Sequence, residues 1–196
     1  MKKKISILLI LFIAFFASSC KTADKSDSTK DNYMEHTPKI SSPILVTSLG
    51  QSIDHIMLER ILDNLNLEYD SLPTSLCDDI KNYNTLLAVV GSSKKGMSFS
   101  DASLEDELKR INDINECIKD YDTNIILIHM GGKNRRGTIS DEIIKAALPI
   151  SGSIIVVGDG NYDNLFTDYA KNHNILSDEV LDMQELQNTI ETYIEN

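Results

Sequence analysis

The residues best suited to binding chemistry stand together in the stretch from His129 to Gly137, which reads HMGGKNRRG. Its three glycines relax the backbone, and its three cations, Lys133, Arg135 and Arg136, fall within four positions. Glycine lets a backbone approach a ligand closely, and unpaired amides at the start of a helix favour an anion. The stretch therefore predicts a binding site for a small anionic or polar ligand more directly than it predicts a reaction.

Three other loops share this mixture of glycine and small polar residues, at positions 47–52, 91–96 and 158–163. Lysines at 94 and 95 add to the cations after His129, which is a high concentration of positive charge for an acidic chain. The ligand is expected to contact residues from all four loops: Ser48, Gly50, Gln51, Ser52, Gly91, Ser92, Ser93, Lys94, His129, Gly131, Gly132, Arg135, Arg136, Asp159 and Asn161.

Arg135 is the residue expected to make the main ligand contact. It follows the glycine pair and precedes a predicted helix, so its guanidinium can reach over the sheet edge toward Ser48, Gln51 and Ser92. Adjacent arginines do not easily face the same way, so one of Arg135 and Arg136 is expected to bind and the other to be structural. In the alternative interpretation these cations pair with nearby aspartates and only hold the loops together: Asp101, Asp159 and Asp163.

A catalytic role is the alternative to binding. His129 ends a predicted strand, where it could act as acid or base beside Asp54 or Asp159 in a lipid-anchored hydrolase or transferase, or could simply be hydrogen-bonded within the strand edge. The chain has no G-x-S-x-G elbow, P-loop or G-x-G-x-x-G motif. Asp159 begins a segment like a calcium loop, but Asn164 and Ala170 stand where that loop needs glycine and glutamate. We therefore expect no metal and no cofactor, and we favour binding.

Apolar runs and helical stripes alternate along the chain and must position these loops. Strands are predicted at Ile44–Thr47, Leu67–Tyr69, Thr85–Val90, Ile125–Ile128, Ser153–Val157 and Asn174–Leu176. Helices are predicted over about Ser52–Leu65, from the cap Ser103 to Ile118, from the cap Ser140 to Pro149, over Leu165–Lys171 and from the cap Asp182 to Tyr193, with a helical turn at Asp78–Asn82. The first helix is expected to bury a stripe of Ile53, Ile56, Met57, Ile61 and Leu65.

This alternation predicts an α/β fold, a three-layer sandwich around a mainly parallel sheet of five to six strands, flavodoxin-like or Rossmann-like. We favour the strand order 2-1-3-4-5 with a marginal sixth strand. Such sheets bind ligands beyond the carboxyl ends of their strands, near the topological switch. The four polar loops all lie at that edge.

The first 42 residues are predicted to lie outside the folded domain. Three lysines, an apolar run of about 13 residues and small residues before Cys20 resemble a bacterial lipoprotein signal peptide over residues 1–19. Cys20 would then carry palmitate-type acyl chains that anchor the chain in the cell membrane at its extracytoplasmic face; an ordinary signal peptide with an incidental cysteine is the alternative. Residues 20–42 lack apolar periodicity and read as a disordered tether, and residues 43–196 form a single α/β domain.

The net charge of the chain narrows the classes of molecule that it can bind. Without the three lysines of the signal peptide, 16 basic residues remain of 19, against 30 acidic ones, a formal net charge of −14. This balance argues against nucleic acid as a partner, whereas a neighbouring transporter or sensor fits a surface-anchored binding protein.

Cys77 and Cys117 can either form a disulfide or pack as free thiols, because an exported protein permits both.

Taken together, the four loops resemble the signature blocks of an uncharacterised family of small exported bacterial α/β domains. The blocks read TSxGQSxD from Thr47, GSSK from Gly91, HxGGxxRRGxxSD from His129 and DGNxDxxFT from Asp159. The resemblance covers about Pro43 to Leu176 and implies the α/β fold and the place of the site. It implies no activity, because the family has none assigned.

Overall fold

The sheet at the centre of the domain has six strands, all parallel, in the order β2-β1-β3-β4-β5-β6. The computed structural model describes residues 37–92, 95, 97 and 102–195. The strands are β1 (Ile44–Leu49), β2 (Asp70–Ser71), β3 (Thr85–Val90), β4 (Asn124–His129), β5 (Ser153–Val157) and β6 (Leu176–Val180). The expected three-layer α/β fold is confirmed, and the order is the flavodoxin-like one extended by β6.

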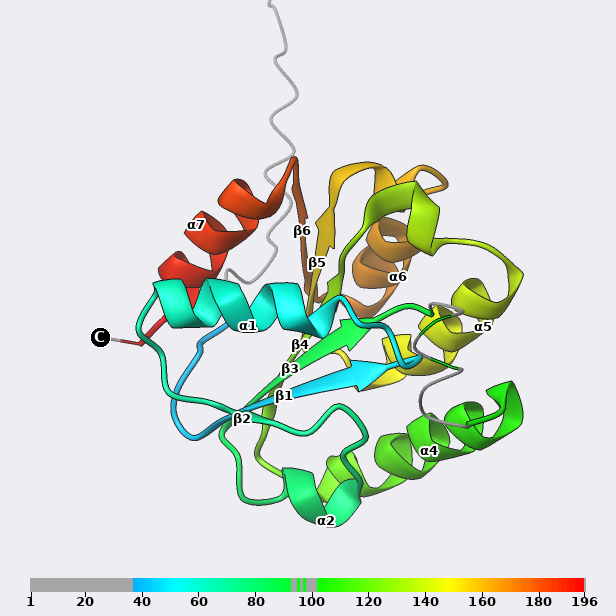
Figure 1. Cartoon of the computed structure of the whole chain (residues 1–196), viewed down its shortest axis with the longest axis horizontal. Helices are drawn as coiled ribbons and strands as arrows, with labels where there is room; N and C mark the ends of the chain where they lie inside the picture. Colours follow the sequence, from blue (N-terminus) through cyan, green and yellow to red (C-terminus); the bar gives the residue numbers. More distant parts are fainter. Residues whose placement is uncertain (1–36, 93–94, 96, 98–101, 196) are drawn as a thin grey trace, which may run out of the picture. The chain divides into compact units, whose positions relative to one another are not determined.

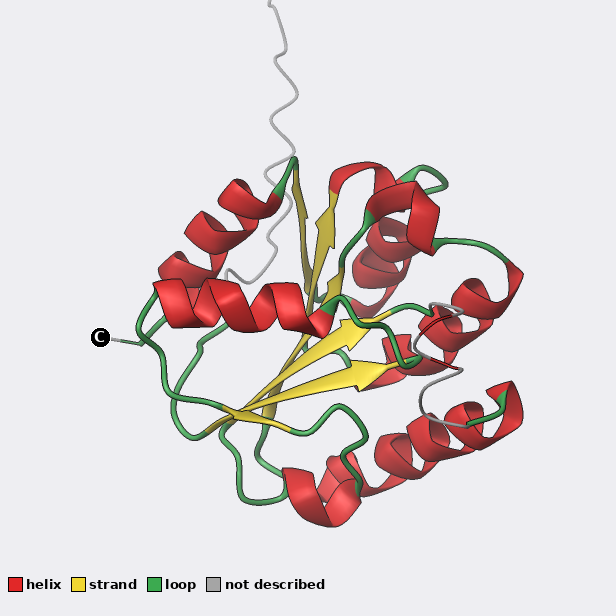
Figure 2. Ribbon diagram, viewed as in Figure 1, coloured by secondary structure: helices red, strands yellow, loops and turns green. Residues whose placement is uncertain are grey.

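The central strands are buried on both faces because helices cover both sides of the sheet (Figure 2). Helices α1 (His55–Asn64) and α7 (Met183–Tyr193) cover one face, and α4 (Leu104–Cys117), α5 (Thr138–Ala147) and α6 (Leu165–His173) cover the other (Figure 1). Residues of alternate parity in each strand face opposite layers; in β3, Leu86 and Ala88 pack with α4 and α5, whereas Leu87 and Val89 pack with α1 and α7. Each continuous apolar strand therefore contributes side chains to two hydrophobic cores, one on each face of the sheet.

The first helix differs from its expected form. Helix α1 begins at His55 rather than Ser52, and its buried residues are Leu58, Ile61 and Leu62. Ile56 and Met57, expected in the buried stripe, are 44% and 40% exposed. Residues 58, 61 and 62 also form a stripe at helical spacing. The sequence therefore allows either of two faces of α1 to be buried, and packing against β1 selects the face with Leu58 and Leu62.

The bounds of other elements differ as well. Strand β6, expected at Asn174–Leu176, forms at Leu176–Val180. Strand β2 pairs at Asp70–Ser71, while Leu67 and Tyr69, expected to form it, pack as side chains against the α1 and α7 core. Ser140 was expected to cap α5, but that helix begins at Thr138. The carboxylate of Asp141 instead accepts a hydrogen bond from the amide of the N-cap residue Gly137 at 3.2 Å.

The chain enters the domain at the amino edge of the sheet. Ile40 is buried and forms a parallel bridge with Ile194, donating its amide to the carbonyl oxygen of Tyr193. Asn124, the first residue of β4, donates its side-chain amide to the carbonyl oxygen of Lys39. Packing therefore begins a few residues before Pro43, the expected start of the domain.

A disulfide joins Cys77, in the short helix α2 (Cys77–Ile80), to Cys117 at the end of α4, with 6.1 Å between their Cα atoms. The structure thus selects pairing over free thiols for these two residues. None of the helices in the described ranges is long and apolar enough to cross a bilayer.

Candidate functional site

The loops that follow β1 and β3 flank the topological switch and are joined to each other. Gln51 and Ser92 form an isolated antiparallel bridge, and the amide of Gly91 donates to the carbonyl oxygen of Leu49 at 3.0 Å. Gly50 has φ 106°, and a Cβ there would lie 2.3 Å from the carbonyl oxygen of Gly91. Only glycine fits this position, because both the dihedral angle and the close contact exclude a side chain.

Beneath these loops lies a buried ion pair that was not predicted from the sequence. Glu107 of α4 is 2% exposed and accepts hydrogen bonds from the amide of Gly50 at 2.7 Å and from Nε2 of Gln51 at 2.9 Å. Arg110, one turn later, binds the same carboxylate and donates to the carbonyl oxygens of Ser48 and Ser75. Burial raises the pKa of Glu107, but the hydrogen bonds and charge of Arg110 outweigh it and hold that pKa below its ordinary value.

A sequence signal for this pair exists. Glu107 lies on the same face of the predicted helix as the apolar stripe of Leu104, Ile111 and Ile114, whereas a solvated glutamate would lie opposite. The consequence for the candidate site is direct. Because the amide of Gln51 is bound to Glu107, this side chain serves the loop rather than an open ligand position.

His129, the candidate acid or base, lies at the end of β4 with its side chain fully buried. Its Nδ1 is 3.0 Å from the carbonyl oxygen of Val90, its Nε2 is 3.3 Å from that of Gly132, and its ring stacks on Phe166. A Cβ at Gly160 would come within 2.6 Å of the ring. Burial lowers the pKa of His129, and the two carbonyl oxygens offset this only in part. The imidazole thus joins three segments of the chain inside the protein.

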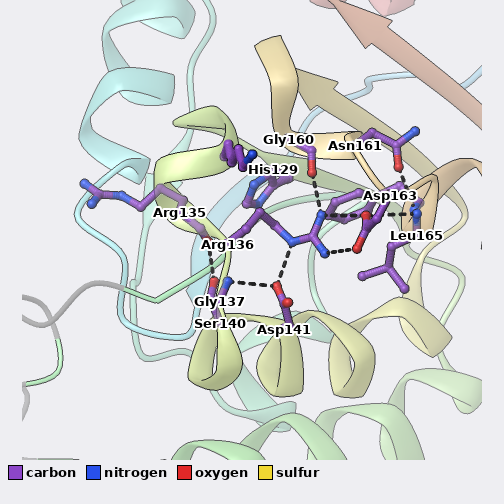
Figure 3. Close-up of polar contacts among 12 residues, drawn as sticks. His129, Arg135, Arg136, Gly137, Ser140, Asp141, Gly160, Asn161, Asp163 and Leu165 are labelled. Atoms are coloured by element: carbon purple, nitrogen blue, oxygen red, sulfur yellow. Dashed lines mark hydrogen bonds and ion pairs between the residues drawn. The ribbon is translucent and has the colours of Figure 1, made fainter.

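Arg136 is the structural arginine of the pair. Its side chain is 1% exposed and donates to Asp141 of α5 at 2.7 Å, to both carboxylate oxygens of Asp163 at 3.0 and 2.8 Å, and to the carbonyl oxygen of Gly160 at 2.6 Å (Figure 3). Burial opposes its charge, but the two carboxylates raise the pKa of Arg136 well above the ordinary value. It therefore clamps the loops after β4 and β5 to α5.

Arg135 points the opposite way from Arg136 (Figure 3). Its Nε and Nη2 donate to Oδ2 and Oδ1 of Asp54 at 2.8 and 3.0 Å, a bidentate pair. Arg135 was expected to reach toward Ser48, Gln51 and Ser92, but the side-chain hydrogen bonds found for its guanidinium among the described residues are those to Asp54. Hydrogen bonding to Asp54 raises the pKa of Arg135. The side chain of Arg135 is 30% exposed and that of Asp54 is 14% exposed, so the pair is open to solvent.

The glycine pair lies between two carboxylates. Gly131 and Gly132 have φ 83° and 56°, and Cβ atoms there would lie 3.5 Å from Oδ2 of Asp54 and 2.4 Å from Oδ1 of Asp159 respectively. Asp159 also accepts the amide of Lys133 at 2.8 Å. The loop thus holds a carboxylate of the chain itself at the start of the 3-10 turn η2 (Gly132–Arg135), the position where an anion was expected.

The remaining candidates are interior or lie elsewhere. Ser48 donates its hydroxyl to the carbonyl oxygen of Ser52, and both serines are buried. Asn161 is buried and bonds Thr167, Glu179 and the amide of Phe166. The expected contacts at Ser93 and Lys94 and the expected lipidation of Cys20 lie outside the described residues. Across the described ranges, no group of three or more histidine, cysteine or carboxylate side chains is arranged to hold a metal ion.

One protein-family model matches residues 41–194, and its description is a domain of unknown function, DUF6305. The chain belongs to this family. No curated protein and no solved structure matches the chain. Membership agrees with the expected uncharacterised family, and it covers the complete sheet and every loop of the candidate site.

Proposed function

We propose that this member of the DUF6305 family is a lipid-anchored binding protein of the extracytoplasmic face, which holds a small polar ligand with an acidic group at the carboxyl edge of its sheet. One observation carries the proposal. Of the three cations that follow β4, Arg135 is fixed by a bidentate contact yet 30% exposed, and no described residue bonds its Nη1. A planar guanidinium held in this way is suited to a carboxylate or phosphate.

The rest of the edge supports the proposal by its rigidity. Arg136 and Glu107 are buried, and each binds backbone atoms of the loops as well as charged side chains. Loops fixed before binding lose little conformational freedom when a ligand arrives, and this raises affinity. In this proposal the frame that holds the loops in place consists of Arg136, Gln51 and Asp159, and Arg135 contacts the ligand.

The point where the chain enters the domain fits an anchored protein. Lys39 and Ile40 contact the amino ends of the strands and the end of α7, while Arg135 lies beyond the carboxyl end of β4. A tether from Cys20 would therefore reach the domain at the edge opposite the ligand loops.

Burial of His129 weighs against the hydrolase or transferase alternative. Both ring nitrogens face backbone carbonyl oxygens, and the side chain is 0% exposed. A general acid or base must reach the proton that it transfers, directly or through one water. We therefore do not propose a reaction for this site.

Two experiments test the proposal. For the anchor, membrane fractionation of Cys20→Ser should move the protein from the membrane to the soluble fraction, and continued membrane association would contradict lipidation. For the ligand, native mass spectrometry of the full chain should detect a copurifying small molecule carrying an acid group.

Titration of that molecule then tests the role of Arg135. The affinity of the protein for that molecule should fall about 30-fold or more in Arg135→Ala. It should fall by an intermediate factor in Arg135→Lys, which keeps the positive charge but loses the two-pronged guanidinium. Arg60→Ala, which removes an exposed arginine from α1, is the matched control and should bind as the wild type. Unchanged affinity in Arg135→Ala, with a lowered melting temperature, would make Arg135 part of the frame.

A further inference from the structure

The charges at the carboxyl edge do not sum to a positive site. Three cations follow β4 at this edge: Lys133, Arg135 and Arg136. Arg135 pairs with Asp54, Arg136 pairs with Asp141 and Asp163, and the backbone amide of Lys133 donates to the carboxylate of Asp159. The formal charge of these seven side chains is −1, in a chain whose formal net charge is −11. A purely anionic ligand gains no net attraction here, although Arg135 offers it a local contact.

Asp54 is placed as a charge partner and not as a helix cap. It occupies the N-cap position of α1, where aspartate normally accepts amides of the first turn, yet its side chain makes no cap hydrogen bond. Both carboxylate oxygens face Arg135 instead. The backbone amide of Asp54 donates to Oγ of Ser52 at 3.2 Å, which helps to hold the residue in place. Helix α1 thus lacks the usual side-chain cap at its N-terminus, and the carboxylate of Asp54 lies beside Arg135 instead.

This arrangement determines which ligand the pair can accept. An acid group bound to Arg135 lies next to the carboxylate of Asp54, and two like charges in a partly buried site repel each other. A ligand that also carries an ammonium group removes the repulsion, because the ammonium pairs with Asp54 while the acid group pairs with Arg135. Nη1 of Arg135 has no bonding partner among the described residues, so the ligand can bind alongside the existing pair.

We propose that the ligand is a small zwitterion of the α-amino acid class, with its carboxylate on Arg135 and its ammonium on Asp54. Arg135 and Asp54 are in direct contact at 2.8 Å, so the two ligand charges must also be close together, as they are in an α-amino acid. This inference rests on the proposed binding function and specifies its ligand. It assigns Asp54 as the residue that selects for the amine.

The test compares amino acids with analogues that lack one charge. The full chain is titrated calorimetrically with each common amino acid, with the matching acid that lacks the amine, and with the matching amide that lacks the carboxylate. At least one amino acid should bind about tenfold or more tightly than both analogues, equivalent to about 1.4 kcal/mol or more. This comparison uses the unmodified protein, so it does not depend on the folding of any variant.

Variants then assign the two charges. Asp54→Asn should reduce the preference for the amine over the acid analogue to about threefold or less, and Arg135→Ala should weaken binding of the amino acid and the acid analogue alike. Arg60→Ala should change neither. A thermal melt of each variant checks that it is folded.

Other outcomes separate this inference from the broader proposal. If the acid analogue binds as tightly as the amino acid and depends on Arg135, the zwitterion is wrong and the acid-binding function stands. If no amino acid binds but inorganic phosphate binds through Arg135, the conclusion is the same. If every ligand that binds is indifferent to Arg135→Ala, both proposals fail.

Discussion

The carboxylate of Glu107 lies 2.7 Å from the amide nitrogen of Gly50, and this contact fastens α4 to the loop after β1. Removing its charge leaves Arg110 buried without a counterion. We expect Glu107→Gln to lower the free energy of unfolding by about 3 kcal/mol, measured by urea denaturation. Glu105→Gln, an exposed change on the same helix, should shift it by less than about 0.5 kcal/mol. Equal effects of the two substitutions would show that the buried pair contributes nothing specific.

The same carboxylate predicts a dependence of stability on pH. The folded-state pKa of Glu107 lies below the ordinary value of 4.5, so the pair contributes its full stability above pH 4.5 and loses it as the pH falls through the lower folded value. The difference in stability between the wild type and Glu107→Gln should therefore be constant above that pH and shrink below it. A difference that grows on acidification would contradict the direction of the shift.

Alanine substitutions at Gly50 and Gly137 should distinguish a steric clash from backbone strain. Gly50→Ala places a Cβ 2.3 Å from the carbonyl oxygen of Gly91 at φ 106°, so both terms act. Gly137 has φ 128°, but a Cβ there meets nothing within 4 Å, so only the strain remains. We expect Gly137→Ala to destabilise by about 1 to 3 kcal/mol and Gly50→Ala by clearly more, both measured by thermal unfolding. Equal losses would mean that the loops after β1 and β3 separate easily.

The adjacent arginines should differ in their effect on stability. Arg136→Ala removes the buried group that binds Asp141, Asp163 and a carbonyl oxygen, and should lower the free energy of unfolding by about 3 kcal/mol. Arg135→Ala removes a partly exposed pair and should cost about 1 kcal/mol or less. Chemical denaturation of both variants makes the comparison, and the reverse order would place the structural role on Arg135.

The disulfide between Cys77 and Cys117 closes a loop with a sequence separation of 40 residues. A loop of this length should stabilise the fold by about 4 kcal/mol in the chain-entropy model. The double change Cys77→Ser and Cys117→Ser should therefore lower the melting temperature, and a reductant should lower that of the wild type to the same value. A reductant that also shifts the melt of the double variant would act elsewhere in the protein.

Much of the fold, and the place of the candidate site within it, follow from local sequence patterns. The continuous apolar runs at Ile44, Thr85, Ile125 and Ser153 match strands β1, β3, β4 and β5 within two residues at either end, because a strand buried on both faces has no polar face to obscure it. Their alternation with helical stripes implies a parallel sheet, and a parallel sheet brings the carboxyl ends of its strands to one edge. The convergence of the four polar loops at one edge therefore needed no tertiary information.

Only the tertiary structure decided which atoms the described polar residues at that edge contact. Arg135 and Arg136 are indistinguishable in sequence, yet one is 1% exposed among two carboxylates and the other opens to solvent beside Asp54. Glu107 shares the apolar face of its helix, but only the tertiary structure shows that α4 places it and Arg110 under the loop at Gly50. Such roles depend on distances between atoms that are far apart in the chain, and a local pattern carries no information about those distances.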